Sequence, residues 1–188
     1  MSIKLSILIP SVPERLAHLQ RIVEDLHQQS KNNSVEILVL LENKKRTIGE
    51  KRNNLIEQSQ GEYVVFVDDD DRVETNYINT LCSTIDANPG VDCIVFDVSV
   101  TINGGEPKIC KYGKEYIYSS DSNFYYRKPN HLMCYARRLA IQHKFLHQSY
   151  HEDDEWASRI SKDIVKQVRV PSTLYYYDFV QKPMNWYT

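Results

Sequence analysis

The 188-residue sequence has no long apolar segment, few cysteines and no excess of charge of one sign. No stretch approaches the roughly 18 apolar residues of a membrane span, and the opening MSIKLSILIP is too short for a signal-peptide core. The four cysteines are scattered and form no C-x-x-C pair, so neither a disulfide scaffold nor a cysteine zinc site is indicated. A formal net charge of −2 gives no general attraction to nucleic acid or anionic membrane. We expect a cytoplasmic protein with reduced thiols.

Short apolar runs alternate with amphipathic segments through the first half of the chain. KLSILIP, VEILVLL and EYVVFV are apolar, β-branched runs typical of buried strands. Apolar residues recur at helical spacing from Pro13 to Ser30, and a second helix is predicted from about Gly49 to Gln60, closed by Gly61 as a C-cap. A helix in VETNYINTLCSTIDANPG and a strand in VDCIVFDVSV continue the alternation. The pattern predicts an α/β fold with a mostly parallel central sheet flanked by helices.

The second half of the chain has a different composition. NGGEPKICKYGKEYIYSS is rich in turn residues and tyrosine, which favours hairpin or edge strands over another strand–helix unit. No internal repeat or flexible linker separates the halves. We expect the second half to add a small irregular lobe to the same sheet, facing the ligand.

Four consecutive aspartates, Asp68 to Asp71, follow the third predicted strand. Ligands of open parallel sheets bind at the carboxyl ends of the strands, so the acidic cluster is expected at a ligand site. Like charges this close raise each other's pKa unless a cation or hydrogen-bond donors compensate. Mg²⁺ or Mn²⁺, held by one or two carboxylates and by substrate phosphates, meets that need. The alternative is a solvated acidic turn that caps the next helix.

Four motifs in order resemble the GT-A-fold glycosyltransferases of inverting family 2, which use nucleotide sugars. They are SILIPSVPER, IGEKRNNLIEQSQGEYVVFVDDDD, PNHLMCYARRLA and HEDDEWASRI, and together they cover most of the chain. The resemblance implies a Rossmann-like GT-A domain over residues 1–188, with a nucleotide-sugar-binding half at 1–103 and an acceptor-binding half at 104–188. It implies an enzyme that moves a sugar from a nucleotide-diphosphate sugar, with a UDP-sugar favoured, to a hydroxyl of a glycan or lipid-linked sugar.

The resemblance also implies roles on the donor side. Asp68 and Asp70 form an Asp-x-Asp motif that holds Mn²⁺ or Mg²⁺, while Asp71 is expected to cap the next helix. The residues implied to bind the nucleotide sugar are Pro10, Ser11, Arg15, Glu42, Arg52, Asp68 and Asp69. Glu42 stands where the family usually has aspartate, which leaves the identity of the base open. Lys44 and Lys45 are expected on a solvated face.

On the acceptor side, the resemblance makes Asp153 the general base that deprotonates the incoming hydroxyl. His131, Glu152 and Trp156 are the implied acceptor-binding residues. Without the resemblance, carboxylates at 152–154 would equally decorate a helix N-terminus. The many tyrosines of the second half, like Trp186, suit either stacking on sugars or strand packing.

Several alternatives stay open from the sequence. A phage-type enzyme of the same family would modify hydroxymethylated DNA bases, with a phosphate-contacting patch at Arg127, Lys128, Arg137 and Arg138. A zinc site at His143, His147 and His151 would need a helix, although KFLHQSYHE has the character of a loop. Two further classes are a Mg²⁺-dependent phosphatase of the haloacid-dehalogenase type, whose Asp-x-Asp normally ends the first strand, and a non-catalytic sugar-nucleotide-binding module.

Overall fold

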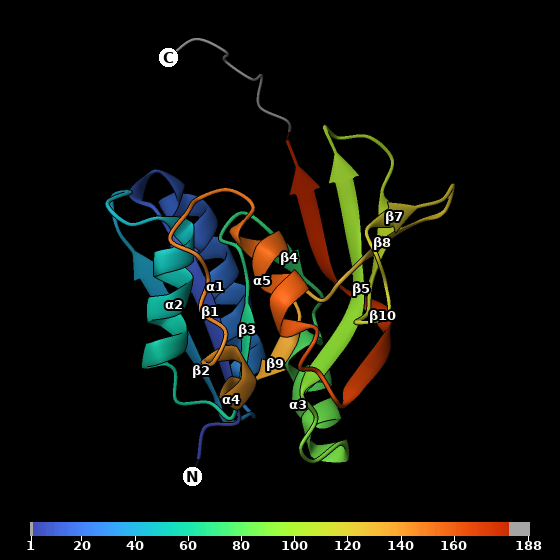
Figure 1. Ribbon diagram of the computed structural model, residues 1–188. Coiled ribbons are helices and arrows are strands. Elements are labelled where there is room, and N and C mark those ends of the chain that lie inside the picture. Colours follow the sequence, from blue (N-terminus) through green and yellow to red (C-terminus); the bar gives the residue numbers. More distant parts are fainter. Residues whose placement is uncertain (1, 181–188) are drawn as a thin grey trace.

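The computed structural model describes residues 2–180 and shows an α/β fold built on one sheet (Figure 1). The first half alternates strands with helices, which confirms the predicted class. Its elements are β1 (Leu5–Ser11), the 3-10 turn η1 (Pro13–Arg15), α1 (Leu16–Ser30), β2 (Val35–Leu41), α2 (Ile48–Gln58), β3 (Tyr63–Phe66), β4 (Arg72–Val73), α3 (Tyr77–Ala87) and β5 (Cys93–Ile102).

The second half supplies short strands, two helices and one long final strand. Its elements are β6 (Lys108–Tyr112), β7 (Ser119–Ser120), β8 (Phe124–Arg127), β9 (Cys134–Ala136), α4 (Arg137–Ala140), α5 (Glu152–Ile160) and β10 (Gln167–Phe179). Strands β6, β8 and β7 continue the sheet to one edge, as the tyrosine-rich composition predicted. Within residues 2–180, no helix combines the length and the apolar character that crossing a bilayer requires.

The sheet runs in the order β2-β1-β3-β9-β5-β6-β8-β7, with β10 paired to β5 and β4. Strands β2, β1 and β3 are parallel. Strand β9 lies antiparallel between β3 and β5, so β5 keeps the direction of the first three strands. Because β9 comes from the second half of the chain, the two halves share one sheet rather than forming separate lobes.

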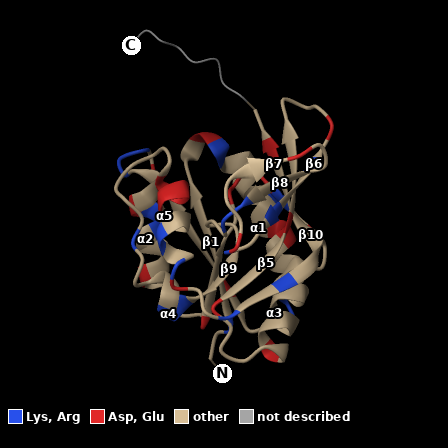
Figure 2. Cartoon of the chain, turned by 45° about the vertical axis from the view of Figure 1, so that its right-hand side comes forward, with Lys and Arg blue, Asp and Glu red and all other residues tan. Residues whose placement is uncertain are grey.

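The apolar runs of the sequence form the buried centre of the sheet. All of β1 and β3 is buried, in agreement with strands that are covered on both faces. Helix α1 packs beside α3, and α2 packs beside α5 (Figure 1). Acidic and basic residues are distributed over helices and loops (Figure 2), as the balanced composition implies. The packing leaves the carboxyl-terminal edge of the parallel strands for polar groups.

Gly61 has a packing role rather than the predicted capping role. Helix α2 ends at Gln58 with Ser59 as its cap, and Gly61 does not have the positive φ of a left-handed C-cap. Its N–H donates to Ser6 Oγ at 2.8 Å. A Cβ added here would lie 2.6 Å from the backbone nitrogen of Ser6 and 2.8 Å from the carbonyl oxygen of Tyr63. The capping prediction is wrong, because close approach to β1 is what requires glycine.

We expect Gly61→Ala to lower the free energy of unfolding by about 1–3 kcal/mol, because the backbone has to move apart to admit the methyl group. Urea unfolding measures the change. Gly105→Ala is the control, since the nearest atom to its added Cβ is 3.1 Å away in an exposed turn. Equal stability of the two variants would contradict this explanation of Gly61.

Candidate active site

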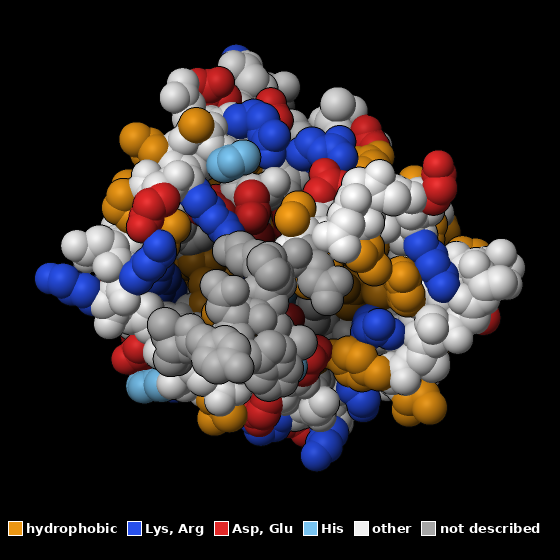
Figure 3. Space-filling model, turned by 90° about the horizontal axis from the view of Figure 1, so that it is seen from above, with side chains coloured by type: hydrophobic (Ala, Val, Ile, Leu, Met, Phe, Trp, Pro, Cys, Tyr) orange, Lys and Arg blue, Asp and Glu red, His pale blue; other side chains and the backbone are white. Residues whose placement is uncertain are grey.

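A cavity of about 540 Å³ opens where β1 and β3 end. Leu8 pairs with Phe66, and the two chains continue side by side, with the N–H of Val67 donating to the Leu8 carbonyl at 3.1 Å. Residues 9–11 and 67–70 therefore meet at one edge of the sheet. Seen from above, acidic and basic side chains lie next to one another on this side of the molecule (Figure 3). Except for Glu42, every residue predicted to bind the donor or the metal lines this cavity: Pro10, Ser11, Arg15, Arg52, Asp68, Asp69 and Asp70.

Glu42 is connected to the cavity through Lys51. Its carboxylate lies 2.8 Å from Lys51 Nζ, and this interaction lowers the pKa of Glu42. Lys51 is buried, lines the cavity and donates to the Ser11 carbonyl at 3.2 Å. The sequence analysis did not single out Lys51, although its helical spacing from Ile48 and Leu55 was a usable signal for the inward face of α2.

Arg15 bridges two of the four aspartates. Its Nη1 lies 2.8 Å from Asp69 Oδ1 and 3.0 Å from Asp70 Oδ2. Asp69 is buried and also accepts a hydrogen bond from Ser11 Oγ at 2.6 Å. The Asp70 side chain is 44% exposed. Burial raises the pKa of Asp70 against the opposing effect of Arg15. Asp69 thus has structural partners, whereas solvent reaches the Asp70 carboxylate at the cavity.

Asp71 is a buried hydrogen-bond acceptor. Tyr175, on β10, donates its hydroxyl to Asp71 Oδ2 at 2.7 Å. Burial and the nearby charge of Asp68 raise the pKa of Asp71 to about 8. Helix α3 begins at Tyr77 after Asn76, without a side-chain cap. The prediction that Asp71 caps this helix is therefore wrong, because its partner comes from a strand distant in sequence.

His131 lies between Asp68 and Asp153. Its Nε2 lies 3.4 Å from Asp68 Oδ2, and its Nδ1 lies 3.6 Å from Asp153 Oδ2. The imidazole is buried, with its ring edge against Phe66. Burial by itself would raise the pKa of Asp68, but His131 and the guanidinium of Arg52 outweigh it and lower that pKa. A carboxylate at the end of β3 and one in the first turn of α5 thus meet across a single imidazole.

Arg52 and Glu152 form a buried ion pair. Arg52 Nη1 contacts Glu152 Oε1, and its Nη2 lies 3.6 Å from Asp68 Oδ1. The guanidinium also lies near two rings, 5.7 Å from the centroid of Phe66 and 5.5 Å from that of Phe145. The prediction that Glu152 contacts the acceptor is wrong, because its buried carboxylate neutralises Arg52. Arg52 lines the donor cavity, but its charge is already paired.

The family can now be stated. The sequence profile described as glycosyl transferase family 2 matches residues 17–151, more than half of the chain. The chain belongs to glycosyl transferase family 2. The resemblance drawn from the four motifs is confirmed. No curated protein matches this family 2 domain significantly.

Solved structures share the fold of this family 2 domain at low sequence identity. TarS from S. aureus has a TM-score of 0.63 and 14% identity over 94% of this chain and 37% of its own. TarS 1-349 in complex with UDP-GlcNAc has a TM-score of 0.61 and 13% identity, covering 98% of this chain and 62% of that one. GalNAc-T7 with UDP, GalNAc and Mn²⁺ has a TM-score of 0.60 and 14% identity, covering 98% of this chain and 45% of that one. The family 2 domain thus spans less than two thirds of each of these chains.

Trp156 of the family 2 domain is a core residue. Its side chain is 1% exposed and stacks on Phe145 at 4.6 Å between ring centroids, with Tyr135 edge-on at 4.9 Å. The indole N–H donates to the carbonyl of His143 at 2.5 Å. The prediction that Trp156 binds the acceptor is therefore wrong, since no substrate reaches it. Trp186, which was expected either to stack on a sugar or to pack against a strand, lies outside the described residues.

The three histidines considered for zinc do not converge. His143 lies 2.9 Å from Asp163, His147 lies 3.7 Å from Glu50, and His151 lies 3.8 Å from Asp154. The segment between α4 and α5 consists of turns and bends rather than a helix. Over residues 2–180, no group of three or more His, Cys, Asp or Glu side chains is arranged to hold a metal ion. The zinc alternative is not supported.

The basic residues considered for DNA phosphates do not form one patch. Arg127 is on β8, whereas Arg137 and Arg138 are on α4, toward the opposite end of the molecule (Figure 1). Arg138 pairs with Asp92, and Arg137 Nε donates to Ser59 Oγ at 2.9 Å. The separation of Arg127 from Arg137 and Arg138, and the pairing of Arg138 with a carboxylate, argue against one phosphate-contacting patch.

Asp68 and Asp70 have the chemistry that a magnesium or manganese ion requires. Both present carboxylate oxygens at the wall of the donor cavity, and hard oxygen ligands are the ones these ions prefer. Two carboxylates are sufficient when substrate phosphates and water complete the coordination. The residues therefore fit a divalent cation that is bound together with a diphosphate.

Proposed function

We propose that this domain transfers a sugar from a nucleoside-diphosphate sugar to an acceptor hydroxyl, with inversion at the anomeric carbon. The observation that carries the proposal is the position of His131 between Asp68 and Asp153. The imidazole lies between a carboxylate of the donor cavity and a second carboxylate that is suited to act as a base. Family membership supports the reaction class, and the TarS complexes with UDP-GlcNAc and UDP support a UDP-sugar as the donor.

In the proposed reaction the acceptor oxygen forms a bond to the anomeric carbon while the bond from that carbon to the diphosphate oxygen breaks. Asp153 takes the hydroxyl proton, and the nucleoside diphosphate leaves with the bonding electron pair. Attack and departure occur on opposite faces of the sugar, which gives inversion in one displacement. The Asp153 side chain is 30% exposed in the first turn of α5, so an incoming hydroxyl can reach it.

The donor cavity is suited to a diphosphate because positively charged side chains lie in its wall together with carboxylates that can hold a divalent ion. Arg15 and Lys51 line the same cavity as Asp68 and Asp70. We propose that residues 1–103 bind most of the nucleotide sugar, with Pro10 and Ser11 near the nucleoside. Residues 104–188 then supply the base and the acceptor contacts, in glycan or polysaccharide assembly.

Asp70 and Asp68 are the residues that would hold Mn²⁺ or Mg²⁺. When bound, such an ion acts as a Lewis acid that stabilises charge on the departing diphosphate. GalNAc-T7, which shares the fold, has a structure with UDP and Mn²⁺. In this chain, Arg15 and Arg52 supply the positive charge beside these two carboxylates.

Asp70→Asn tests the donor site directly. We expect wild-type protein with Mn²⁺ and UDP at 100 times the dissociation constant to gain about 2.7 kcal/mol of stability. Asp70→Asn should lose the Mn²⁺-dependent part of that gain, measured by thermal unfolding with and without Mn²⁺. Asp86→Asn is the control, because Asp86 is exposed and pairs with Lys4 at 2.6 Å. The proposal fails if wild type shows no shift, or if Asp70→Asn shows the full one.

A further inference from the structure

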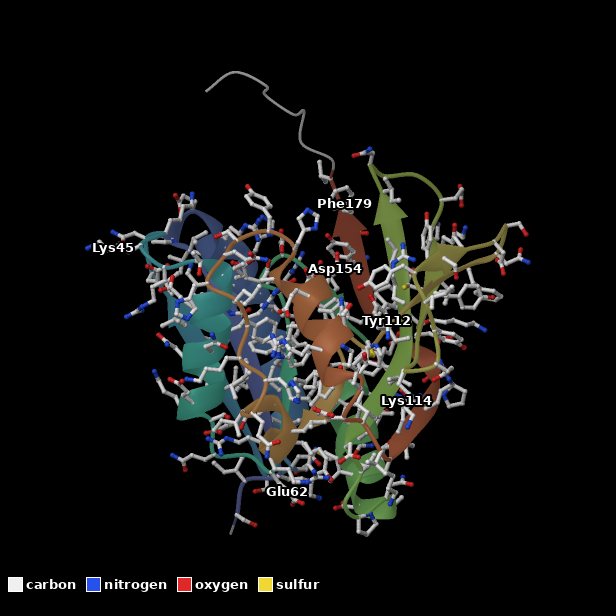
Figure 4. The ribbon with its side chains drawn as sticks, in the orientation of Figure 1. Lys45, Glu62, Tyr112, Lys114, Asp154 and Phe179 are labelled. Carbon is white, nitrogen blue, oxygen red and sulfur yellow. The ribbon has the colours of Figure 1, made fainter. Side chains whose placement is uncertain are left out.

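A second cavity, of about 490 Å³, lies between α5 and strands β5, β6, β8 and β10. Tyr177 lines both this cavity and the donor cavity, so the two adjoin. Asp154, the residue after the proposed base, is part of its lining. Figure 4 shows Asp154 on α5, Tyr112 on β6 and Phe179 on β10 around this part of the molecule. The second cavity therefore begins beside the reacting centre.

The lining of the second cavity is aromatic with a polar rim. Its rings come from Tyr112, Tyr118, Tyr125, Tyr177 and Phe179. Among the described lining residues, the charged side chains are Arg127 and Asp154, which balance each other. Small-molecule sites of this size typically combine apolar and aromatic walls with a few placed polar groups. The composition fits a neutral ligand that has both apolar faces and hydroxyl groups.

The polar groups of the rim are held in place. Tyr118 donates its hydroxyl to Asp154 Oδ1 at 2.5 Å. The guanidinium carbon of Arg127 lies 5.0 Å from the ring centroid of Tyr118 and 5.5 Å from that of Tyr125. Arg127 Nη1 donates to the carbonyls of Ser119 and Tyr126 at 3.0 and 2.8 Å. These bonds use the N–H groups of Nη1 and hold the guanidinium in place beside the two rings.

We propose that the second cavity is a carbohydrate subsite that binds a neutral sugar of the acceptor next to the one that receives the transferred residue. The proposal rests on the proposed function, because it names the substrate class of the same site. A sugar ring has apolar C–H faces that pack on tyrosine rings, and hydroxyls that bond to the Asp154 carboxylate and the tyrosine hydroxyls. An acceptor oligosaccharide that is bound in this cavity and extends along Tyr177 would present the hydroxyl of its next sugar toward Asp153.

Adjacent tyrosines on β8 give a matched pair of variants. Tyr125 lines the cavity, whereas Tyr126 does not, and its hydroxyl bonds to Asp121 at 2.9 Å. Successive residues of a strand point to opposite faces, so the two truncations remove the same ring from opposite sides of one element. Phe179→Ala is a third variant with little risk to folding, because Phe179 lies at the end of β10 and is 41% exposed.

The test titrates cellotriose, maltotriose and chitotriose into the protein by calorimetry, with Mn²⁺ and UDP present. We expect at least one of these neutral trisaccharides to bind with a millimolar or lower dissociation constant. Tyr125→Ala and Phe179→Ala should each weaken that binding by about tenfold, as the loss of a stacked ring would cause. Tyr126→Ala should bind as wild type. The inference is overturned if none of the three sugars binds, or if all variants bind equally.

Two further arms separate the possible failures. UDP affinity is measured in the same samples. If wild-type protein does not bind UDP, the proposed function itself is wrong. Retained UDP binding without sugar binding would remove the carbohydrate subsite alone. Trigalacturonate and vesicles of phosphatidylglycerol serve as anionic probes, and preference for either over the neutral sugars would assign the cavity to an acidic ligand and overturn the inference.

Discussion

Asp153→Asn should reduce sugar transfer by about 10²–10⁴-fold, the usual contribution of a positioned general base. Donor affinity should be unchanged, because Asp153 is not part of the donor cavity. The measurement compares the initial rate of UDP release from UDP-GlcNAc in the presence of a trisaccharide with the UDP dissociation constant from calorimetry. A lowered rate with unchanged affinity is the signature of a group that acts on the acceptor.

Glu155→Gln is the matched control for Asp153. It removes one negative charge from the first turn of the same helix, where Glu155 pairs with Arg159 at 2.7 Å. We expect its transfer rate to stay within about twofold of wild type, since a partly exposed i,i+4 pair contributes little. If Asp153→Asn keeps more than about a tenth of the wild-type rate, another group is the base.

Glu152→Ala, one position earlier, should affect folding rather than chemistry. Removing this carboxylate leaves Arg52 buried, with Asp68 3.6 Å away as its remaining charged partner. Breaking a buried ion pair by removing one partner costs about 3–5 kcal/mol. Chemical unfolding should therefore show a large fall in the free energy of unfolding for Glu152→Ala.

Two comparisons make the Glu152 result specific. Glu57→Ala removes an exposed partner of Lys144, at 2.6 Å, and should change stability by less than about 0.5 kcal/mol. The double variant Arg52→Met, Glu152→Leu should recover most of the loss, because apolar residues of similar volume replace a buried ion pair well. A small effect of Glu152→Ala alone would show that the pair is not a major source of stability.

The placement of the aspartates at the edge of the sheet was predictable from the sequence because it needs only the direction of strands, whereas the other donor residues came from the family resemblance. Apolar runs that end at Pro10 and at Val67 place their following residues at the same edge of any parallel sheet. Ser11 and Asp69 do meet there, at 2.6 Å. The exact register was not required for that inference.

The centre of the sheet was not predictable in the same way. Strand β9 has three residues, Cys134–Ala136, which is too short for any periodicity to be read. Its antiparallel insertion between β3 and β5 depends on long-range pairing. Strand β9 begins shortly after His131 in the chain, so the position of that imidazole between two carboxylates was also not predictable from the sequence.

The acidic residues in the first turn of α5 show why the sequence could not predict the contacts of individual side chains. Consecutive residues of a helix point about 100° apart. Glu152 contacts Arg52, Asp153 faces His131, and Asp154 accepts from Tyr118. Three adjacent carboxylates thus serve a buried pair, the proposed chemistry and the second cavity. Only the rotational setting of α5 against its neighbours decides which carboxylate takes which position.

The run of four aspartates has a consequence for the proposed donor site when it is empty. Asp68 is compensated by Arg52 and His131, Asp69 by Ser11 and Arg15, and Asp71 by a tyrosine hydroxyl and a raised pKa. Asp70 is held by the partly exposed guanidinium of Arg15. These partners relieve only part of the repulsion within the run, since burial and the neighbouring aspartates still raise the pKa of Asp70. If Asp70 holds the proposed divalent ion, its binding would be an exchange in which Arg15 gives up its contact with Asp70.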